Sequence, residues 1–326
     1  MSTIDATLDR EATARSRRKA WDWIAEKLIY LSSFVAMSLI ILIFVFVAKE
    51  SLPVVTSAEV HKEVTIGQLF LPQQYGTPEA PLPFVCQPVS QVPKYSLMPL
   101  ILGSLKVTIV AMLFATPLAI LAALFTTEFA PRWLREIVKP VIEMLAGIPS
   151  VVLGFFALIV LATWVQDTLN LDFRLNAINA GVALSLAVIP IIYTICEDAL
   201  TAVPKSYRQA SMALGASPWQ TAWKVVLPSA LPGVFAGVVL GFGRAVGETM
   251  IVLMASGNAA ITSWNFTESV RTLSASIAAE LGEVVVGSPH YHVLFFLGTL
   301  LFVFTFVLNW IGTAMVGRLR RRLAGA

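Results

Sequence analysis

Six long apolar runs constrain the fold of this chain more than any other feature. They lie at 28–48, 101–125, 141–165, 177–196, 231–257 and 291–316. Each run is long enough to cross roughly 30 Å of hydrocarbon as a helix that rises about 1.5 Å per residue. Because 57% of the 326 residues are hydrophobic and only 13% are charged, and the mean hydropathy is +0.77, we predict an all-α integral membrane protein with six transmembrane helices.

The first run follows the basic residues Arg15, Arg17, Arg18 and Lys19, as the apolar core of a secretory signal does. The core of a cleaved signal has about 7–15 residues, and this run is longer. We therefore interpret it as an uncleaved first span. The predicted segments are a tail at 1–27, a first span at 28–48, an outer segment at 49–100, a core of five spans at 101–316 and a basic tail at 317–326.

The basic residues fall mainly in alternate segments between the runs. The two tails and the loops near 126–139 and 201–230 hold clusters of Lys and Arg. The opposite segments hold only Lys49, Lys62, Lys94, Arg174 and Arg271. Since Lys and Arg are enriched in cytoplasmic loops, we predict that both termini are cytoplasmic. The net charge of +3 is explained by these segments, and we expect no nucleic-acid partner.

The sequence offers few residues for a metal site or for nucleotide chemistry. Cys86 lies in the long outer segment and Cys196 at the inner end of the fourth run, so the predicted membrane separates them. His290 and His292 are placed in an outer loop without a third ligand. No stretch resembles the phosphate-binding motif G-x-x-x-x-G-K-[ST]. We therefore expect that the chain binds no metal and no cofactor and is not an enzyme.

Two outer segments connect the spans. The segment 49–100 contains eight prolines, which argue against a long helix, so we expect an extended and loop-rich cap. The segment 258–290 contains SVRTLSASIAAELGEV, whose apolar residues recur every three or four positions. This spacing predicts a short helix that dips back toward the membrane.

The predicted inner segment 201–230 reads as two short helices. Pro204 is placed to open the first, Gly215 to end it in a left-handed turn, and Ser217-Pro218 to begin the second. We expect a helix–turn–helix lying at the inner face. The simpler alternative is a loop that only connects two spans, but a compact amphipathic helix pair is more than a connection needs.

The spacing in this segment resembles the EAA loop of bacterial ABC importer permeases. That pattern is E-A-A, three residues, Gly, nine residues, Ile, one residue and Leu-Pro; here the places are held by Gln209-Ala210-Ser211, Gly215, Val225 and Leu227-Pro228. The departure is Gln209 in place of Glu. In that family the loop docks on a separate ATPase subunit, so the resemblance implies that ATP and Mg are used by a partner. The residues implied in coupling to it are Tyr207, Gln209, Ala210, Ser211, Gly215, Ala216, Ser217 and Pro218.

The stretch GRAVGETM at 243–250 places two ionisable residues in an apolar run. Arg244 falls near the midpoint of the fifth run, and Glu248 follows four residues later, on the same face of a continuous helix. Gly233, Gly237 and Gly241 share that face and indicate close helix packing. An inward-facing intramembrane ion pair indicates a transport pathway, although an internal structural salt bridge is the alternative. A guanidinium suits an oxyanion, and a carboxylate can accept a hydrogen bond from a protonated one.

GRAVGETM is also similar to the G-R-A-x-G-E-T signature of the phosphate-specific ABC permeases. EMLAGIPSVVLG at 143–154 resembles their third-span segment, and the match extends through FATPLAILAALFTTEFAP and LSASIAAELGE, over roughly 100–316. The long outer segment resembles the C-type subunit (PstC-type) more than the A-type. The resemblance implies a type I, MetI-like permease in a bacterial inner membrane. The implied pathway residues are Gly243, Arg244, Gly247, Glu248 and Thr249.

The same resemblance implies the partners and the substrate. These are an A-type phosphate permease subunit, a dimer of ATPase subunits, an extracytoplasmic phosphate-binding protein and inorganic phosphate, which is moved by alternating access. Sulfate and molybdate permeases share a similar R-A-x-G-E core, so a permease for sulfate, molybdate or tungstate is the alternative. Thr249 and the third-span segment favour phosphate. A membrane enzyme using Glu143, Glu248 and the two histidines is disfavoured, because the predicted topology separates these residues. A passive anion channel would not need a docking helix.

Four more residues are expected to have a gating or structural role. Pro149 is predicted to bend the third span, with Glu143 near its inner end and Ser150 beside it, so the three form a possible gate. The alternatives are a fixed kink and an interfacial carboxylate. Lys106 lies about one turn from the outer end of the second run, where we expect a structural role with its amine extended to the headgroups.

Overall fold

The computed structural model describes residues 2–73, 75–77 and 80–324, with side chains described for 21–73, 83–319 and 321. The side chains of Arg10, Arg15, Arg17, Arg18 and Lys19 in the predicted N-terminal tail, and those of Arg320 and Arg322, lie outside the described side chains. The protein divides into two units, Met1–Glu50 and Ser51–Ala326. The first unit is one helix, α1 (Ser2–Ser51). Its apolar part is exposed along its length, as expected of a span surrounded by lipid.

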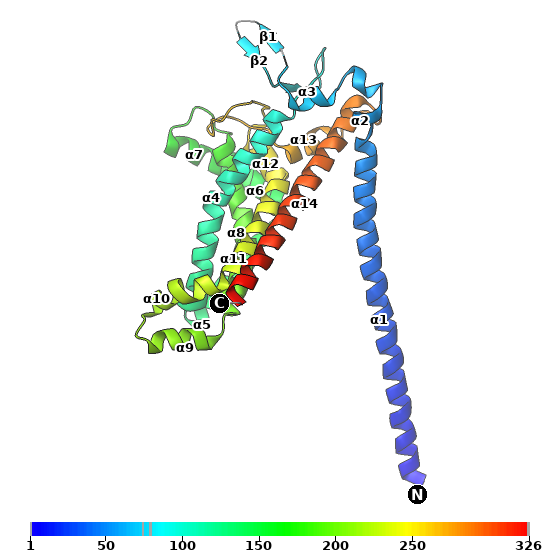
Figure 1. The fold of residues 1–326 in the computed structure, drawn as a ribbon, viewed down its shortest axis with the longest axis vertical. Helices are drawn as coiled ribbons and strands as arrows, with labels where there is room; N and C mark the ends of the chain where they lie inside the picture. The colour runs from blue at the N-terminus through cyan, green and yellow to red at the C-terminus, as the bar shows by residue number, and fades with distance from the viewer. Residues whose placement is uncertain (1, 74, 78–79, 325–326) are drawn as a thin grey trace. The chain divides into compact units, whose positions relative to one another are not determined.

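Four long helices form the centre of the second unit (Figure 1). They are α4 (Met98–Glu128), α8 (Ala177–Thr201), α11 (Leu227–Gly247) and α14 (Pro289–Ala324). The face that α4 turns to the core carries Ala111, Ala115, Ala119 and Ala123, all fully buried. Small residues every four positions let two helices approach closely. On the α8 side, a side chain at Gly181 would lie 2.5 Å from Val110.

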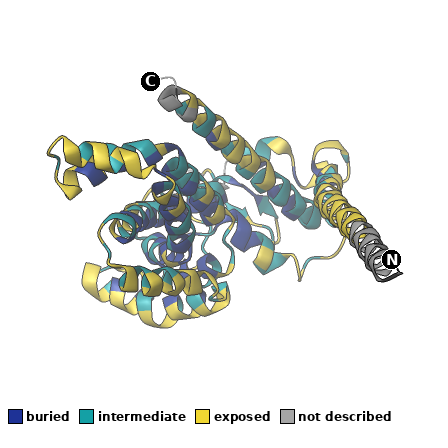
Figure 2. Ribbon diagram, turned by 90° about the horizontal axis from the view of Figure 1, so that it is seen from below, coloured by how far each residue is buried: buried dark blue, intermediate teal, exposed yellow. Residues whose placement is uncertain are grey.

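Exposed residues lie on the outward faces of these helices, and buried residues gather where the helices meet (Figure 2). Many of the exposed residues are large and apolar. Leu113 and Leu118 of α4 are examples of the exposed set. Such a surface is suited to hydrocarbon and not to water. Over the described residues, six helices are long and apolar enough to cross a membrane. This number agrees with the six predicted spans.

The third span differs from its predicted boundaries. A separate helix, α5 (Arg132–Ala146), precedes it and ends before Gly147. The span itself is α6 (Ser150–Phe156), one π-helical turn η2 (Ala157–Leu161) and α7 (Ala162–Leu169). Pro149 precedes the first residue of α6, with φ −57° and ψ 135°. The prediction that Pro149 bends the span from within was therefore wrong; Pro149 starts the helix, where its missing N–H costs no hydrogen bond.

The fifth span also begins earlier than predicted. After α9 (Lys205–Ala213), the chain turns and enters α10 (Pro218–Thr221), a π-helical turn η3 (Ala222–Val226) and α11 without interruption. The second helix of the predicted helix–turn–helix is therefore the start of the fifth span. Ser217 begins it through a reciprocal cap with Gln220, in which each side chain bonds the backbone of the other residue. The span ends at Gly247, and α12 (Met250–Ala255) follows.

Residues 51–100 form short elements packed on one end of the helices. These elements are α2 (Pro53–Thr56), η1 (Val60–Lys62), α3 (Ile66–Phe70), the antiparallel pair β1 (Tyr75–Thr77) and β2 (Ala80–Leu82), and the antiparallel pair β3 (Cys86–Gln87) and β4 (Lys94–Tyr95). Val54 and Leu69 are fully buried in a second apolar cluster that includes Leu273, Leu294 and Leu297. Over the described residues of this segment no long helix occurs, as predicted, but the segment is more folded than the expected loop-rich cap.

The segment 258–290 contains a short helix, α13 (Leu273–Glu280), as predicted, and this helix packs against α4, α12 and α14. Two expectations at this end were wrong. Lys106 does not extend to the headgroups: it is 1% exposed, and its Nζ donates hydrogen bonds of 2.8 Å to the carbonyl oxygens of Ser263 and Asn265. His290 and His292 lie in the first turn of α14 and not in a loop.

Candidate functional site

The stretch GRAVGETM does not form a continuous helix. The helix α11 ends at Gly247, Glu248 is extended with φ −68° and ψ 135°, and α12 begins only at Met250. Arg244 therefore lies in the last turn of α11 and not at the midpoint of a span. The hydroxyl of Ser274 donates a 2.7 Å hydrogen bond to the carbonyl oxygen of Glu248. This bond and the low helix propensity of Gly247 stabilise the break.

The predicted pairing of Arg244 with Glu248 was wrong. Because the backbone turns at Glu248, the two side chains do not share a helical face. Among the side chains that the structure describes, no ion pair joins them. Arg244 is exposed in the single chain and Glu248 is partly exposed. The structural salt bridge, which was the alternative interpretation of this motif, is therefore excluded by the geometry.

The glycine face of α11 packs on α8, as predicted. An added side chain would lie 2.3 Å from Cβ of Ala199 at Gly233, and 2.5 Å from Cγ1 of Ile192 at Gly241. This close packing fixes the rotation of α11. Arg244 follows Gly241 by about one turn, and its side chain is exposed.

The break lies beside an open cavity of about 470 Å³. Gly247 and Thr249 line it from one side, and Ser274 and Ile277 of α13 line it from the other. Sequence reasoning placed Gly247 and Thr249 in the pathway but missed Ser274. Its only signal was the resemblance of the stretch that contains it, because a serine in an apolar segment does not by itself indicate a contact with a distant carbonyl.

The possible gate residues lie in two elements. Glu143 is exposed on α5, so it does not belong to the third span. Pro149 and Ser150 begin α6, which packs on α12: a side chain at Gly154 would lie 3.0 Å from the carbonyl oxygen of Met250. The third span therefore contacts the helix that follows the break, and a gating role for this contact stays a prediction.

The predicted coupling residues gather at the opposite end of the second unit, with α5, α9 and α10 (Figure 1). Gly215 has φ +84°, the left-handed conformation predicted for it. An open cavity of about 630 Å³ lies there, lined among others by Tyr207, Ala210, Ser211, Gly215 and Ala216. Gln209 faces a neighbouring cavity with Pro218. The structure thus brings the predicted residues into one exposed region.

Ion pairs hold both ends of the second unit. At the end with α13, Glu280 binds Nη1 of Arg271 at 2.6 Å and Nε2 of His290 at 3.0 Å. Burial raises the pKa of Glu280, but the hydrogen bond from His290 and the charge of Arg271 outweigh it, so the pKa lies below its usual value. At the other end, Arg208 binds Glu128. Among the described residues, no group of three or more His, Cys, Asp or Glu is placed to hold a metal.

These observations define a class of protein. Over its described residues the chain has six helices that are long and apolar enough to cross a membrane, a helix break beside an exposed arginine at the end of the fifth span, and an exposed helix between the fourth and fifth spans. Such an arrangement is that of a multi-pass membrane protein with a short exposed helix between two of its spans.

Comparison with known proteins places the chain within this class. Residues 115–324 match the family described as "Binding-protein-dependent transport system inner membrane component". Because the match covers more than half of the sequence, the chain belongs to this family. It is therefore the membrane component of a transport system, which confirms the predicted importer permease family.

Individual relatives agree with this assignment. The chain is 39% identical over 220 residues to "Probable ABC transporter permease protein YqgH" of Bacillus subtilis, covering 68% of this chain and 71% of that one. It is 35% identical over 248 residues to "Phosphate transport system permease protein PstC" of Xylella fastidiosa, covering 70% and 76%. It is 33% identical over 249 residues to "Phosphate transport system permease protein PstC 1" of Mycobacterium tuberculosis, covering 70% and 74%.

Solved structures support the fold. One is the MetNI methionine ABC transporter in an inward-facing conformation, with a TM-score of 0.53 at 21% identity, covering 67% of this chain and 93% of that one. Another is a bacterial alginate ABC transporter with its alginate-bound periplasmic protein, with a TM-score of 0.54 at 15% identity, covering 92% and 97%. The predicted MetI-like architecture is thereby confirmed.

Proposed function

We propose that this chain is a permease subunit of an ATP-driven importer of inorganic phosphate and works by alternating access. The observation that carries the proposal is the similarity, over about 70% of the chain, to permeases named for phosphate transport. The exposed arginine in the last turn of α11, Arg244, supports it, because a guanidinium keeps its charge when desolvated and binds oxyanions through a planar fork of donors.

The proposed partners are an A-type phosphate permease subunit, a dimer of ATPase subunits and an extracytoplasmic phosphate-binding protein. ATP and Mg are used by the ATPase subunits, and this chain binds no cofactor. The exposed face of α9, with Tyr207 and Gln209, is the proposed ATPase contact. The open side of α11 around Arg244 is the proposed contact with the pathway and with the second permease subunit. Both termini are proposed to be cytoplasmic, from the distribution of Lys and Arg.

The proposed mechanism assigns a role to each part of the helix break. Arg244 attracts the anion, and its charge is not cancelled by Glu248, because the break turns that carboxylate off the same helical face. Glu248 and Thr249 then discriminate between oxyanions. A protonated oxyanion donates a hydrogen bond to the carboxylate of Glu248, whereas an oxyanion without a proton is repelled by it. Binding stays weak, since tight binding at the membrane site would slow release. The two-state rocking of the paired permeases opens this site to one side at a time.

The test is ATP-dependent uptake of labelled phosphate, sulfate, molybdate and tungstate into vesicles that hold the assembled complex. We expect phosphate alone to be carried. Arg244→Ala is expected to assemble normally and to lose about tenfold or more of the uptake, the loss typical of removing one charged partner from a desolvated contact. Arg244→Lys keeps the positive charge but lacks the planar fork of donors, so its uptake is expected to lie between that of the wild type and that of Arg244→Ala.

The matched control is Arg132→Ala, which removes an exposed arginine from the first position of α5, outside the spans. It is expected to transport as the wild type does. Preference for sulfate, molybdate or tungstate would refute the proposed substrate. Normal phosphate uptake by an assembled Arg244→Ala complex would remove Arg244 from the pathway.

A further inference from the structure

The helix α9 is joined to the rest of the chain by unusually few side chains. Of its nine residues, only Arg208 and Ser211 are partly buried, and the other seven are exposed. The helix makes no apolar core of its own with the body. An open cavity of about 450 Å³ lies beneath it, with Glu128 and Arg208 in its wall. Among the described side chains, two polar contacts join α9 to the spans, and its backbone also lies close to η3.

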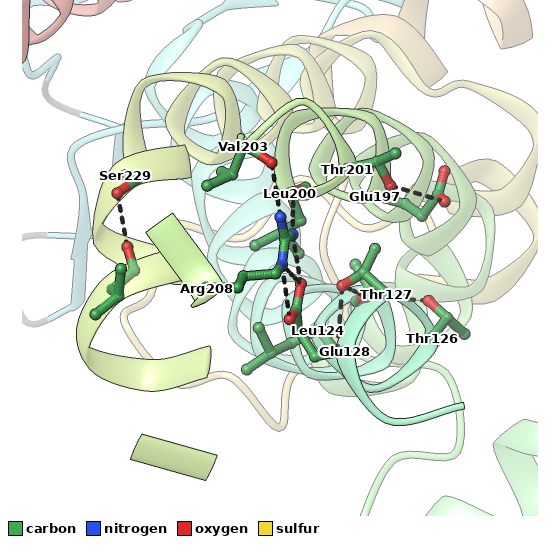
Figure 3. Close-up of polar contacts among 12 residues, drawn as sticks. Leu124, Thr126, Thr127, Glu128, Glu197, Leu200, Thr201, Val203, Arg208 and Ser229 are labelled. Atoms are coloured by element: carbon green, nitrogen blue, oxygen red, sulfur yellow. Dashed lines mark hydrogen bonds and ion pairs between the residues drawn. The ribbon is translucent and has the colours of Figure 1, made fainter. Parts of the chain in front are cut away.

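The first contact is a fork of hydrogen bonds from one guanidinium (Figure 3). Nε of Arg208 donates to Oε1 and Oε2 of Glu128 at 3.1 and 3.0 Å, and Nη2 donates to Oε1 at 2.6 Å. Nη2 also donates to the carbonyl oxygen of Leu200 at 2.9 Å, and Nη1 donates to that of Val203 at 2.6 Å. Glu128 is the last residue of α4, and Leu200 lies in the last turn of α8. One side chain of α9 thus holds the ends of two spans.

The second contact leads to a different span. The hydroxyls of Ser211 and Thr221 lie 2.9 Å apart, and Thr221 belongs to α10, at the start of the fifth span. The two contacts of α9 therefore join it to different spans. Arg208 connects it to α4 and α8, and Ser211 connects it to the helix that continues into α11.

The geometry of the first contact makes it stiff. The side chains of Arg208 and Glu128 are 19% and 11% exposed, so water competes little for their hydrogen bonds. A guanidinium is planar, and several donors of Arg208 are used at once, which fixes its orientation. One turn inside the body, the hydroxyl of Tyr193 in α8 and that of Thr126 in α4 are 3.1 Å apart. The ends of α4 and α8 are thus tied to each other as well as to α9.

We propose that Arg208 and Glu128 form the link through which movement of α9 is passed to α4 and α8. This rests on the proposed function, in which an ATPase subunit docks on α9. Movement imposed on the docked helix reaches a span only through a contact that stays intact in both states. Arg208 makes the contacts with Glu128 of α4 and Leu200 of α8 that could serve in this way. Both Arg208 and Glu128 lie at the end of the second unit opposite the break at Glu248 (Figure 1), so we assign them a positioning role.

The proposal makes a specific prediction about energy use. If Arg208 or Glu128 is neutralised, α9 remains attached through Ser211 and through the chain, so the ATPase still docks and still hydrolyses ATP. The spans α4 and α8 no longer follow. ATP is then consumed with less phosphate carried, which differs from a simple loss of stability, because unfolding lowers transport and hydrolysis together.

The experiment measures phosphate uptake and ATP hydrolysis in the same preparation of proteoliposomes that hold the whole complex. The variants are Arg208→Gln, Glu128→Gln and the double variant. We expect phosphate carried per ATP to fall about tenfold in each single variant, in the middle of the usual range for coupling between sites. The double variant should be no worse than a single one, because residues that act as one unit are not additive.

Arg135→Gln is the matched control. Arg135 also binds the end of α4, through the carbonyl oxygens of Thr126 and Thr127, and lines the same cavity. Among the described contacts of its side chain, none reaches α9. We expect this variant to keep the wild-type ratio of phosphate to ATP. A fall equal to that of Arg208→Gln would show that any loosening of this end uncouples the complex, and it would overturn the proposed link.

Other outcomes are equally decisive. If uptake and hydrolysis fall together in the Arg208 and Glu128 variants, so that their ratio is unchanged, the link is refuted. If Arg208→Gln fails to copurify with the ATPase, Arg208→Lys replaces it; an intermediate ratio is expected, and a wild-type ratio refutes the link. If the wild-type complex carries a different oxyanion, the proposed substrate fails, and the ratio is measured with that anion.

Discussion

Lys139 of α5 donates a hydrogen bond of 2.6 Å from Nζ to Oε2 of Glu197 in α8. This hydrogen bond raises the pKa of Lys139 above its usual value. The side chain of Glu197 is 6% exposed, and α5 has no buried residue of its own. The pair is therefore a main attachment of α5, together with the bonds from Arg135 to the end of α4.

Lys139→Ala is expected to destabilise the protein more than Lys139→Arg. The alanine variant leaves the carboxylate of Glu197 buried without its nearest cation, which costs about 1–3 kcal/mol for an unsatisfied polar group and more for a charged one. Thermal unfolding in detergent measures the difference. Equal melting temperatures for the wild type and Lys139→Ala would show that α5 is held by other contacts.

The third span was predicted to start at 141 but starts at Ser150, and a hydropathy window cannot detect the reason. Residues 141–146 are apolar enough to extend the third run, but they belong to a separate amphipathic helix, α5, which also carries Arg135 and Lys139. A window of apolar residues does not record which face they share. Gly147 and Pro149 were the signals that separate the two helices, because neither favours a helix interior.

Lys106→Met is expected to destabilise the end of the second unit that contains α13. The wild-type amine is 1% exposed and satisfies the carbonyl oxygens of Ser263 and Asn265, which the thioether cannot do. We expect a loss of about 1–3 kcal/mol and faster proteolysis within 258–270. Lys62→Met, at an exposed position of η1, is the control and should change neither. An unaltered digestion pattern in Lys106→Met would contradict this role.

Gly103→Ala is expected to destabilise the protein although alanine favours a helix. An added side chain at Gly103 would lie 2.2 Å from the carbonyl oxygen of Arg271, a backbone atom that cannot turn away. Helix propensity alone predicts stabilisation of up to about 1 kcal/mol, so the sign of the change decides between the two effects. Gly282→Ala, where nothing lies within 4 Å, is the control. A stabilised Gly103→Ala variant would show that α4 and the segment before α13 separate easily.

The thiol of Cys86 is expected to resist alkylation in the folded protein. Burial raises the pKa of Cys86 from 9.0 to about 12, with the charge of Glu280 adding to it. Because the thiolate is the reactive form, labelling at pH 8 should be about a hundredfold slower or more than at a cysteine placed at exposed Val89. The raised pKa also means that its contribution to stability is present below about pH 9 and is lost as the pH rises toward about 12. Rapid labelling of folded Cys86 would refute its burial.

Whether the sequence predicts a feature of the candidate site depends on how far apart in the chain the interacting residues are. Pro204, Gly215 and Ser217 act on their own backbone, and the structure confirms the helix and turn that they predict. Contacts between distant segments carry no such local signal. The fork from Arg208 to Glu128 spans 80 residues, and the bond from Ser274 that stabilises the break at Glu248 spans 26. For this reason the periodicity that paired Arg244 with Glu248 assumed a continuous helix and was wrong.

The ion pairs of Glu280 predict that the folded protein loses stability at low pH. Hydrogen bonding from His290 and the charge of Arg271 hold its pKa below the usual 4.5, in spite of burial. A carboxyl group with a depressed pKa contributes stability that is fully present above its unfolded pKa and is lost as the pH falls through the folded pKa. The wild type should therefore lose stability below about pH 4.5. Glu280→Gln is expected to be less stable at neutral pH, because Arg271 loses its anion, and to change less with acid. Denaturation curves between pH 3 and 7 measure this slope, and equal slopes for the two proteins would show that another carboxylate carries the acid sensitivity.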